Sequence, residues 1–348
     1  MKGKNVSTRF YNIPFEIQSF NDMPYRHLGN SGLKVSDVGL GTWKMGYPHT
    51  GDGSRIDEKS SMQIFDRALE LGVTFWDTAN RYNNASGNSE RLIGSWFKDN
   101  PDQRRNIVLA TKLSGGMDGL TPNHCGLSRT NIMESVYSSL ERLQTDHIDL
   151  LYFHSFDPLT PPDESLLAIE DLVKQDLVRY FAVSNFTADQ LKLYQSVESK
   201  LSSRVRIVAL QNQFDILNGE GKGFEGALEY AERSDISFIA WSPMARGLLT
   251  NRYLDPSTAG PGDRLFDEGL LQERTGKETI KKLQSLSKIA AELTIELNQL
   301  VIAYMLSIPG MGPVIPTSSN IKQLESNAAA GNISLSDEHK KLVAELIS

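Results

Sequence analysis

Residues 147–154 read HIDLLYFH, a nearly continuous apolar run that ends in a histidine. The segment before it places Ile132, Val136, Leu140 and Leu143 at the three- and four-residue spacing of a helix with one apolar face. Parallel strands that are buried on both faces have such continuous apolar runs. The stretch therefore predicts a helix followed by a buried parallel strand.

The same alternation extends in both directions along the chain. Seven further apolar runs are separated by longer amphipathic segments: VSDVGLGTW (35–43), VTFWDTA (73–79), NIVLATKL (106–113), LVRYFAVSN (177–185), RIVALQNQ (206–213), ISFIAWSP (236–243) and GPVIPT (312–317). Eight strand–helix units fit an α/β fold of the (β/α)8 TIM-barrel type. The rival, a doubly wound open sheet, would carry G-x-G-x-x-G after its first strand, but Gly39 and Gly41 are followed by Lys44 at the third position.

Two segments lie outside the repeated units. Residues 25–35 are expected to form a β-hairpin around a Gly-Asn-Ser-Gly turn and to close the lower end of the barrel. A long segment at about 244–311, between strands seven and eight, is expected to be an insertion over the barrel mouth. The predicted organisation is an N-terminal extension at 1–23 and a single barrel domain at 24–348.

Composition limits the classes of partner. The 348 residues are 39% hydrophobic and 23% charged, with a formal net charge of −7, which argues against a surface that collects nucleic acid or anionic lipid. Neither a secretory signal nor a bilayer-spanning stretch is evident, and Cys125 is the only cysteine, so a cytoplasmic protein without disulfides is expected. The six histidines are scattered without metal-ligand spacing, and no metal is predicted.

Four polar residues lie at matched places in consecutive units. Asp77, Lys112 and His154 each fall at the end of a predicted strand, and Tyr82 follows in the loop after the strand that carries Asp77. The carboxyl ends of barrel strands converge on one mouth, where barrel enzymes carry their catalytic side chains. Each residue alone has a structural explanation, but their joint placement predicts one catalytic site.

The motifs around these residues resemble those of the aldo-keto reductase superfamily. They include GVTFWDTANRY (72–82) with NSERLIG (88–94), SLERL (139–143) with DHIDLLYFH (146–154), VRYFAVSNF (178–186), QNQ (211–213), WSP (241–243) and VIP (314–316). The resemblance covers about residue 25 to the C-terminus and is closest to the bacterial general aldo/keto reductases and the potassium-channel β subunits. It implies an NADP(H)-dependent oxidoreductase that reduces, or reversibly oxidises, an aldehyde, ketone or sugar.

The resemblance implies a catalytic tetrad of Asp77, Tyr82, Lys112 and His154. Tyr82 would be the general acid in reduction and the general base in oxidation, with the Lys112 ammonium favouring its phenolate form. Asp77 would hold Lys112 by charge pairing. His154 would orient the substrate carbonyl, and Trp43 and Phe156 would line the substrate pocket with Tyr82.

The resemblance also implies a nicotinamide cofactor site that is assembled from several strand ends. Its expected residues are Gly41, Thr42, Trp43, Asp77, Ser184, Asn185, Gln211, Trp241, Ser242, Pro243, Met244, Ala245, Arg246, Gly247, Leu248, Pro316, Thr317, Ser318, Ser319, Gln323 and Asn327. Ser184, Asn185 and Gln211 would bond the carboxamide, and Trp241 would stack beneath the ring. Residues 242–248 would wrap the pyrophosphate, and residues 316–327 would take the adenosine end.

One departure from many relatives bears on cofactor choice. Where a lysine or arginine often faces the 2′-phosphate, this chain has hydroxyl and amide side chains, with only Lys322 basic nearby. Without a bidentate guanidinium the preference for phosphate weakens. NADP(H) is expected, together with tolerance of NAD(H).

Two other functions remain open from the sequence. The chain could be a cofactor-binding regulator of the potassium-channel β type, although the complete tetrad argues against it. It could also be a barrel isomerase or hydrolase that binds a phosphorylated sugar without a redox cofactor. In every case the expected partner is a small molecule.

Overall fold

The computed structural model describes residues 17–117, 119–201 and 204–347. Most of the expected N-terminal extension, residues 1–16, lies outside this range. The central sheet runs in the order β12-β11-β9-β8-β7-β6-β5-β4, with neighbouring strands parallel. Its strands are β4 (Leu40–Gly41), β5 (Phe75–Asp77), β6 (Val108–Leu113), β7 (Ile148–Phe153), β8 (Val178–Ser184), β9 (Ile207–Asp215), β11 (Ser237–Trp241) and β12 (Met311–Val314).

The sheet closes on itself between its first and last strands. Gly39 N donates to Val314 O at 2.8 Å, and Gly41 N donates to Pro316 O at 3.1 Å. A side chain at Gly41 would be tightly placed, because its Cβ would lie 3.0 Å from the carbonyl oxygen of Ile315. The expected (β/α)8 barrel is therefore confirmed, and absence of a side chain at Gly41 lets the two edges approach.

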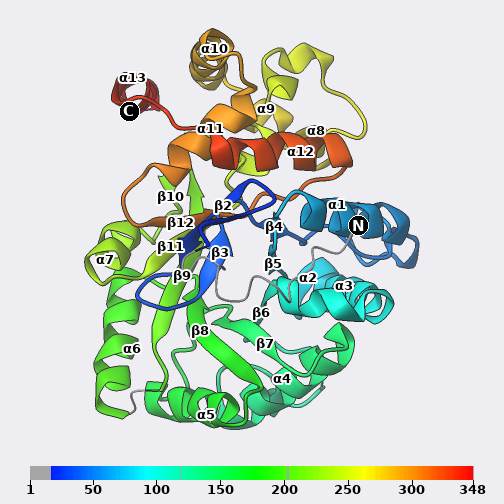
Figure 1. Ribbon diagram of the computed structural model, residues 1–348, viewed down its shortest axis with the longest axis vertical. Helices are drawn as coiled ribbons and strands as arrows, with labels where there is room; N and C mark the ends of the chain where they lie inside the picture. The colour runs from blue at the N-terminus through cyan, green and yellow to red at the C-terminus, as the bar shows by residue number, and fades with distance from the viewer. Residues whose placement is uncertain (1–16, 118, 202–203, 348) are drawn as a thin grey trace, which may run out of the picture.

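Helices surround the sheet, as Figure 1 shows. They are α1 (Glu58–Glu70), α3 (Asn88–Asp99), α4 (Arg129–Leu143), α5 (Pro162–Lys174), α6 (Ala188–Leu201), α7 (Ala227–Arg233), α11 (Leu297–Leu306), α12 (Ile321–Ala329) and α13 (Asp337–Ile347). Side chains cap several of them: Asp57 accepts from Ser60 N before α1, and Ser128 accepts from Asn131 N before α4. These bonds satisfy amide groups that have no partner within the helix.

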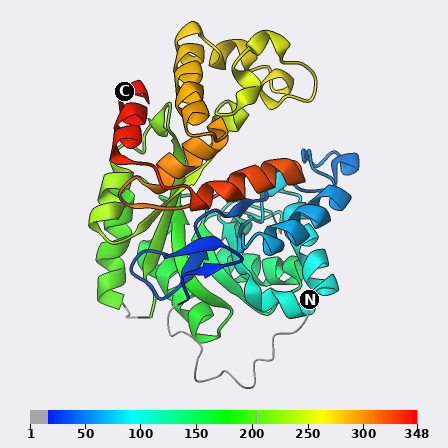
Figure 2. The same cartoon turned by 45° about the horizontal axis from the view of Figure 1, so that its top comes forward.

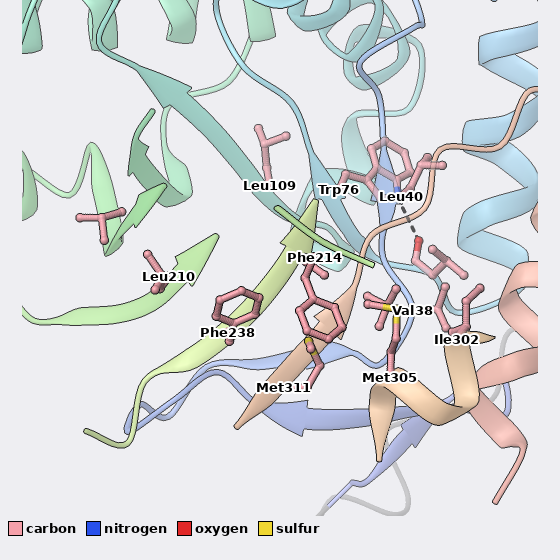
Figure 3. Close-up of a cluster of buried hydrophobic side chains, with 14 of the residues drawn as sticks. Val38, Leu40, Trp76, Leu109, Leu210, Phe214, Phe238, Ile302, Met305 and Met311 are labelled. Carbon is pink, nitrogen blue, oxygen red and sulfur yellow. Dashed lines mark hydrogen bonds between the residues drawn. The ribbon is translucent and has the colours of Figure 1, made fainter. Parts of the chain in front are cut away.

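Apolar side chains fill the space between the sheet and its helices. Figure 3 shows part of this layer, where Phe238 of β11 and Met311 of β12 lie near Met305 of α11. A second, smaller cluster fills the interior of the barrel and includes Phe75, Leu150 and Ile239. The barrel is thus packed below its mouth, and only the strand ends are available for chemistry.

The predicted hairpin closes the amino-terminal end of the barrel. It consists of β2 (Met23–His27) and β3 (Lys34–Ser36), and β1 (Ser19–Phe20) adds a third strand. Leu28 and Val35 pack into the barrel interior. The predicted strand at 35–43 is corrected in one respect: its first two residues belong to β3, and its barrel part is β4 alone. The chain has to turn between the two sheets, so one apolar run supplies both.

The last helix of the segment expected as an insertion, α11, packs against β12. The rest of this segment projects beside α11 and α12, in yellow and orange at the top of Figures 1 and 2. It contains α8 (Arg264–Asp267), α9 (Leu271–Arg274) and α10 (Lys277–Glu292). Arg55 joins it to the loop after β4 through Asp267, with 2.5 Å between Nη2 and Oδ2. By length and composition, no single described helix could cross a bilayer; α10 and α11 meet that test only as a pair, which is bent by 88°.

Candidate active site

A buried acid–base network lies at the carboxyl ends of β5 and β6. Lys112 Nζ is 2.5 Å from Asp77 Oδ1, 2.7 Å from Tyr82 Oη and 2.8 Å from Thr78 O. Tyr82 Oη lies 3.1 Å from the same Asp77 oxygen. The expected residues from two strand ends and the following loop therefore meet at one point, because adjacent parallel strands end at the same edge.

His154 completes this group from the end of β7. Its ring packs edge-on against the Tyr82 ring, with 6.1 Å between centroids. Its backbone is held by Leu113 O and by Asn185 Nδ2, at 2.8 Å each, whereas its imidazole has no hydrogen-bond partner among the described residues. The imidazole nitrogens are thus available to a substrate oxygen beside Tyr82.

The loop after β5 fixes the direction of Tyr82. The three residues that follow Tyr82 all have positive φ: 56° at Asn83, 57° at Asn84 and 58° at Ala85. Asparagine tolerates this conformation, but alanine adopts it at a cost. Asn83 Nδ2 donates to Met45 O at 2.6 Å, which ties the turn to the loop after β4.

Burial sets the protonation state of the network. The pKa of Tyr82 is raised well above its ordinary value, first by burial and then by the Asp77 carboxylate. Burial lowers the pKa of Lys112, and the Asp77 charge offsets part of this. The expectation that the Lys112 ammonium favours the phenolate of Tyr82 stays a prediction; Lys112 Nζ lies within hydrogen-bond distance of Tyr82 Oη and also pairs with Asp77. Tyr82 is held protonated, as a proton donor.

The pKa of His154 is lowered to about 3, by burial and by the positive charges of Lys112 and Arg81. The imidazole is therefore neutral at pH 7. A neutral imidazole offers one donor nitrogen and one acceptor nitrogen. It can orient a carbonyl oxygen through its N–H but carries no spare proton.

The residues expected near the nicotinamide form a second connected network. Gln211 Nε2 donates to Asp77 Oδ2 at 2.8 Å, and Asn185 Nδ2 lies 3.1 Å from Ser184 Oγ. Trp241 Nε1 donates to Asn185 Oδ1 at 3.0 Å. The Ser184 hydroxyl proton and Gln211 Oε1 take no part in these bonds, so this group can still offer a donor and an acceptor to a carboxamide.

The residues expected at the pyrophosphate and adenosine ends of the cofactor bond to other side chains of the protein. Arg246 forms an ion pair with Glu268, with 2.6 Å between Nη1 and Oε2, and Glu268 also pairs with Arg264, so these three side chains together keep a net positive charge. At the other end, Asn327 Nδ2 donates to Ser318 Oγ at 3.1 Å, and Gln323 Oε1 accepts from both the amide and the hydroxyl of Ser319 at 2.8 Å.

Several remaining expected residues have visible structural roles. Thr42 Oγ1 donates to Asp77 O at 3.0 Å. The Thr317 hydroxyl lies against Gly41, where a Cβ would be only 3.1 Å from its oxygen. Leu248 is buried, and Met244 and Ala245 pack against the core. Pro243 and Gly247 lie in the same turn, in which Ser242 has a φ of 60°, and Pro316 bonds the first strand through its carbonyl.

Trp43 and Phe156, the expected substrate-pocket residues, differ in position. Trp43 is 39% exposed, and its ring centroid lies 6.5 Å from that of Tyr82. Phe156 instead packs edge-on against Phe186 and Tyr194, with centroids 5.5 Å and 6.1 Å away. The structure thus places Trp43 beside the Tyr82 network, whereas Phe156 packs against aromatic side chains of the segment from Phe186 to α6.

Sequence reasoning missed three residues around this site. Tyr152 is fully buried below Lys112, whose Nζ lies 5.5 Å from the Tyr152 ring centroid. Asn298 Nδ2 donates to Asn327 Oδ1 at 2.9 Å, and Arg264 places its guanidinium carbon 5.2 Å from the Trp43 ring centroid. Asn298 could have been found as a polar residue in the apolar run LNQLVIAYML; Arg264 has no such signal.

The fold is a closed (β/α)8 barrel, and a buried tyrosine–lysine–aspartate network at its mouth can exchange protons with a bound molecule. The chain belongs to the aldo/keto reductase family, whose profile matches residues 37–348. This membership supports an oxidoreductase that reduces carbonyl groups. No cluster of His, Cys, Asp and Glu suitable for a metal occurs among the described residues.

Individual relatives carry two kinds of name. Aldo-keto reductase AMT2 of Alternaria alternata is 30% identical, over 91% of this chain and 89% of its own length. Versiconal hemiacetal acetate reductase of Aspergillus parasiticus is 29% identical, over 93% and 96%. A probable voltage-gated potassium channel subunit beta of Oryza sativa subsp. japonica is 31% identical, over 88% and 91%.

Proposed function

We propose that this protein is an NAD(P)H-dependent reductase of small aldehydes, ketones or sugars, with Tyr82 as the general acid. The observation that carries this proposal is the position of Tyr82 Oη, 2.7 Å from the buried Lys112 ammonium and beside the imidazole of His154, which bonds to none of the described residues. A nicotinamide cofactor, when bound, supplies the hydride. Ser184, Asn185, Gln211 and Trp241 would hold its carboxamide end.

The chain's own residues have distinct tasks in this proposal. His154 donates a hydrogen bond to the carbonyl oxygen and fixes its orientation. Tyr82 gives its proton to that oxygen as negative charge develops there, and the neighbouring ammonium of Lys112 stabilises the phenolate that remains. Asp77 keeps Lys112 in place through the 2.5 Å contact. Reversal of these steps gives alcohol oxidation.

A Tyr82→Phe variant tests the proposal directly. Wild-type protein is expected to consume NADPH in the presence of 4-nitrobenzaldehyde, and the variant is expected to lose roughly a hundredfold or more in kcat. Quenching of tryptophan fluorescence by NADPH should persist, because the substitution removes only a hydroxyl. Tyr137→Phe, at a half-exposed site on α4, is the matched control. Turnover by Tyr82→Phe within tenfold of wild type would contradict the role of Tyr82.

A cofactor-binding regulator is the second candidate, favoured by the relatives named as potassium channel subunits. The uncommitted His154 imidazole and the complete tetrad favour the reductase. Fluorescence quenching by NADPH without turnover of any aldehyde, ketone or aldose would favour the regulator instead.

We further propose NADP(H) as the preferred cofactor, with substantial use of NAD(H). Ser319 and Gln323 at the start of α12 are neutral, and Asn320 Oδ1 caps this helix by accepting from Gln323 N at 3.0 Å. Hydroxyls and helix-terminal amides bind phosphate, but less selectively than a guanidinium. The ratio of kcat/KM for NADPH to that for NADH should stay below about a hundredfold, and a larger ratio would contradict this proposal.

A further inference from the structure

The loop after β5 carries one charged side chain that the tetrad does not use. Arg81 directly precedes Tyr82, and its side chain is exposed. Among the residues that the structure describes, no carboxylate lies within ion-pair distance of its guanidinium, and its side chain makes no hydrogen bond to any of them. The insertion arginines differ: Arg246 and Arg264 both pair with Glu268, at 2.6 Å and 2.8 Å.

The position of the Arg81 side chain is defined by its contact with the loop after β6. Its guanidinium lies against Gly115 in the loop after β6, where a Cβ would fall 1.9 Å from Arg81 Nη1 and 2.6 Å from Cδ. The lack of a side chain at Gly115 therefore makes room for the guanidinium. After burial and Lys112, the charge of Arg81 is the third cause of the lowered pKa of His154. Arg81 thus belongs to the part of the mouth formed by the ends of β5, β6 and β7.

Among the described residues, the carboxylates near this part of the mouth are bonded to other groups, and none of them pairs with Arg81. Asp77 is buried and already bonded to Lys112, Tyr82 and Gln211. Asp157, in the loop after β7, accepts hydrogen bonds from Leu127 N and Leu159 N at 2.8 Å each. An anion that entered here would displace no ion pair between Arg81 and another described residue.

We propose that Arg81 is a specificity-determining residue that binds an anionic group, a carboxylate or a phosphate, on the carbonyl substrate. This inference rests on the proposed reductase function. The planar guanidinium can hold such a group by two parallel hydrogen bonds while Tyr82 and His154 engage the carbonyl oxygen. The preferred substrates are then aldehydes or ketones that carry a negative charge at the end away from the reacting carbon.

Matched substrate pairs test this assignment. The first pair is 4-carboxybenzaldehyde and its neutral methyl ester; the second is glyceraldehyde 3-phosphate and glyceraldehyde. A charge-assisted pair at a partly exposed site should make kcat/KM about tenfold to a hundredfold higher for the anionic member of at least one pair. The pair that shows the preference distinguishes a carboxylate from a phosphate ligand. The preference should fall as ionic strength rises.

Variants then locate the preference. Arg81→Gln should reduce the anionic-to-neutral ratio to near one, and Gly115→Ala should reduce it by displacing the guanidinium. Arg105→Gln removes the same charge from the exposed segment before β6, at the opposite end of the barrel, and should keep the wild-type ratio. A wild-type ratio near one for both pairs, or an Arg81→Gln ratio equal to wild type, overturns the proposal.

The design separates this inference from the reductase assignment. Turnover of neutral carbonyls without any anionic preference overturns the Arg81 assignment alone. If no carbonyl is turned over with either cofactor, the proposed function fails. Binding of benzoate, measured by tryptophan fluorescence in wild type and Arg81→Gln, then decides the anion site: weaker binding by the variant supports it, and equal affinities overturn it.

Discussion

The neutral state of His154 has a measurable consequence for stability. Its pKa is about 3 in the folded protein against an ordinary value of 6.5. Between these two pH values the unfolded chain binds a proton at His154 that the folded protein excludes. The free energy of unfolding is therefore unaffected by His154 above pH 6.5 and decreases as the pH falls below it. The linkage relation gives a loss of about 2 kcal/mol between pH 7 and pH 5, and about 3 kcal/mol by pH 4.

A His154→Gln variant isolates this contribution. Urea denaturation of both proteins at pH 7, 6, 5 and 4 gives the free energy of unfolding of each. Carboxyl groups that titrate elsewhere affect both proteins alike, so the difference between them reports the histidine. Wild type should lose about 2 kcal/mol relative to His154→Gln from pH 7 to pH 5. His49→Gln, at an exposed turn, is the control for the loss of an imidazole.

The reasoning would be refuted if the difference in the free energy of unfolding between wild type and His154→Gln were constant between pH 7 and pH 5. That result would mean that the imidazole is as easily protonated in the folded protein as in the unfolded chain. The same argument predicts that kcat/KM for carbonyl reduction has no inflection near pH 6.5 arising from His154, because its protonation lies far below that pH.

Three further substitutions follow from the contacts. Lys112→Met leaves the Asp77 carboxylate buried without its counter-charge, so turnover should be lost and the unfolding free energy should fall by about 3–5 kcal/mol in chemical denaturation; unchanged stability would contradict the buried pair. Glu90→Gln removes the charge that faces Arg142 Nε at 2.6 Å, and should lower stability by about 2–4 kcal/mol while aldehyde turnover persists. Gly72→Ala should lower the thermal midpoint, because φ is 73° and a Cβ would meet a backbone carbonyl of β1; an unchanged midpoint would show that the N-terminal sheet can move aside.

The sequence by itself determined the barrel and the residues that meet at its mouth. Apolar runs at 73–79, 106–113 and 147–154 identify strands because burial on both faces is a local property of each run. Once the strands are parallel and adjacent, Asp77, Lys112 and His154 at their ends have to converge. The predicted hairpin and the insertion followed from the same local pattern and its interruptions.

The tertiary structure alone decided how these side chains are partnered. That burial and Asp77 raise the pKa of Tyr82 follows from contacts between separate segments of the chain. The same holds for the position of Glu268 between two arginines and for the packing of Phe156 against Phe186 and Tyr194. The Arg81 guanidinium, which pairs with none of the described carboxylates, and the space left for it at Gly115 are of the same kind. Hydropathy periodicity records only whether a residue is buried, whereas pKa and ion pairing depend on which groups surround it in three dimensions.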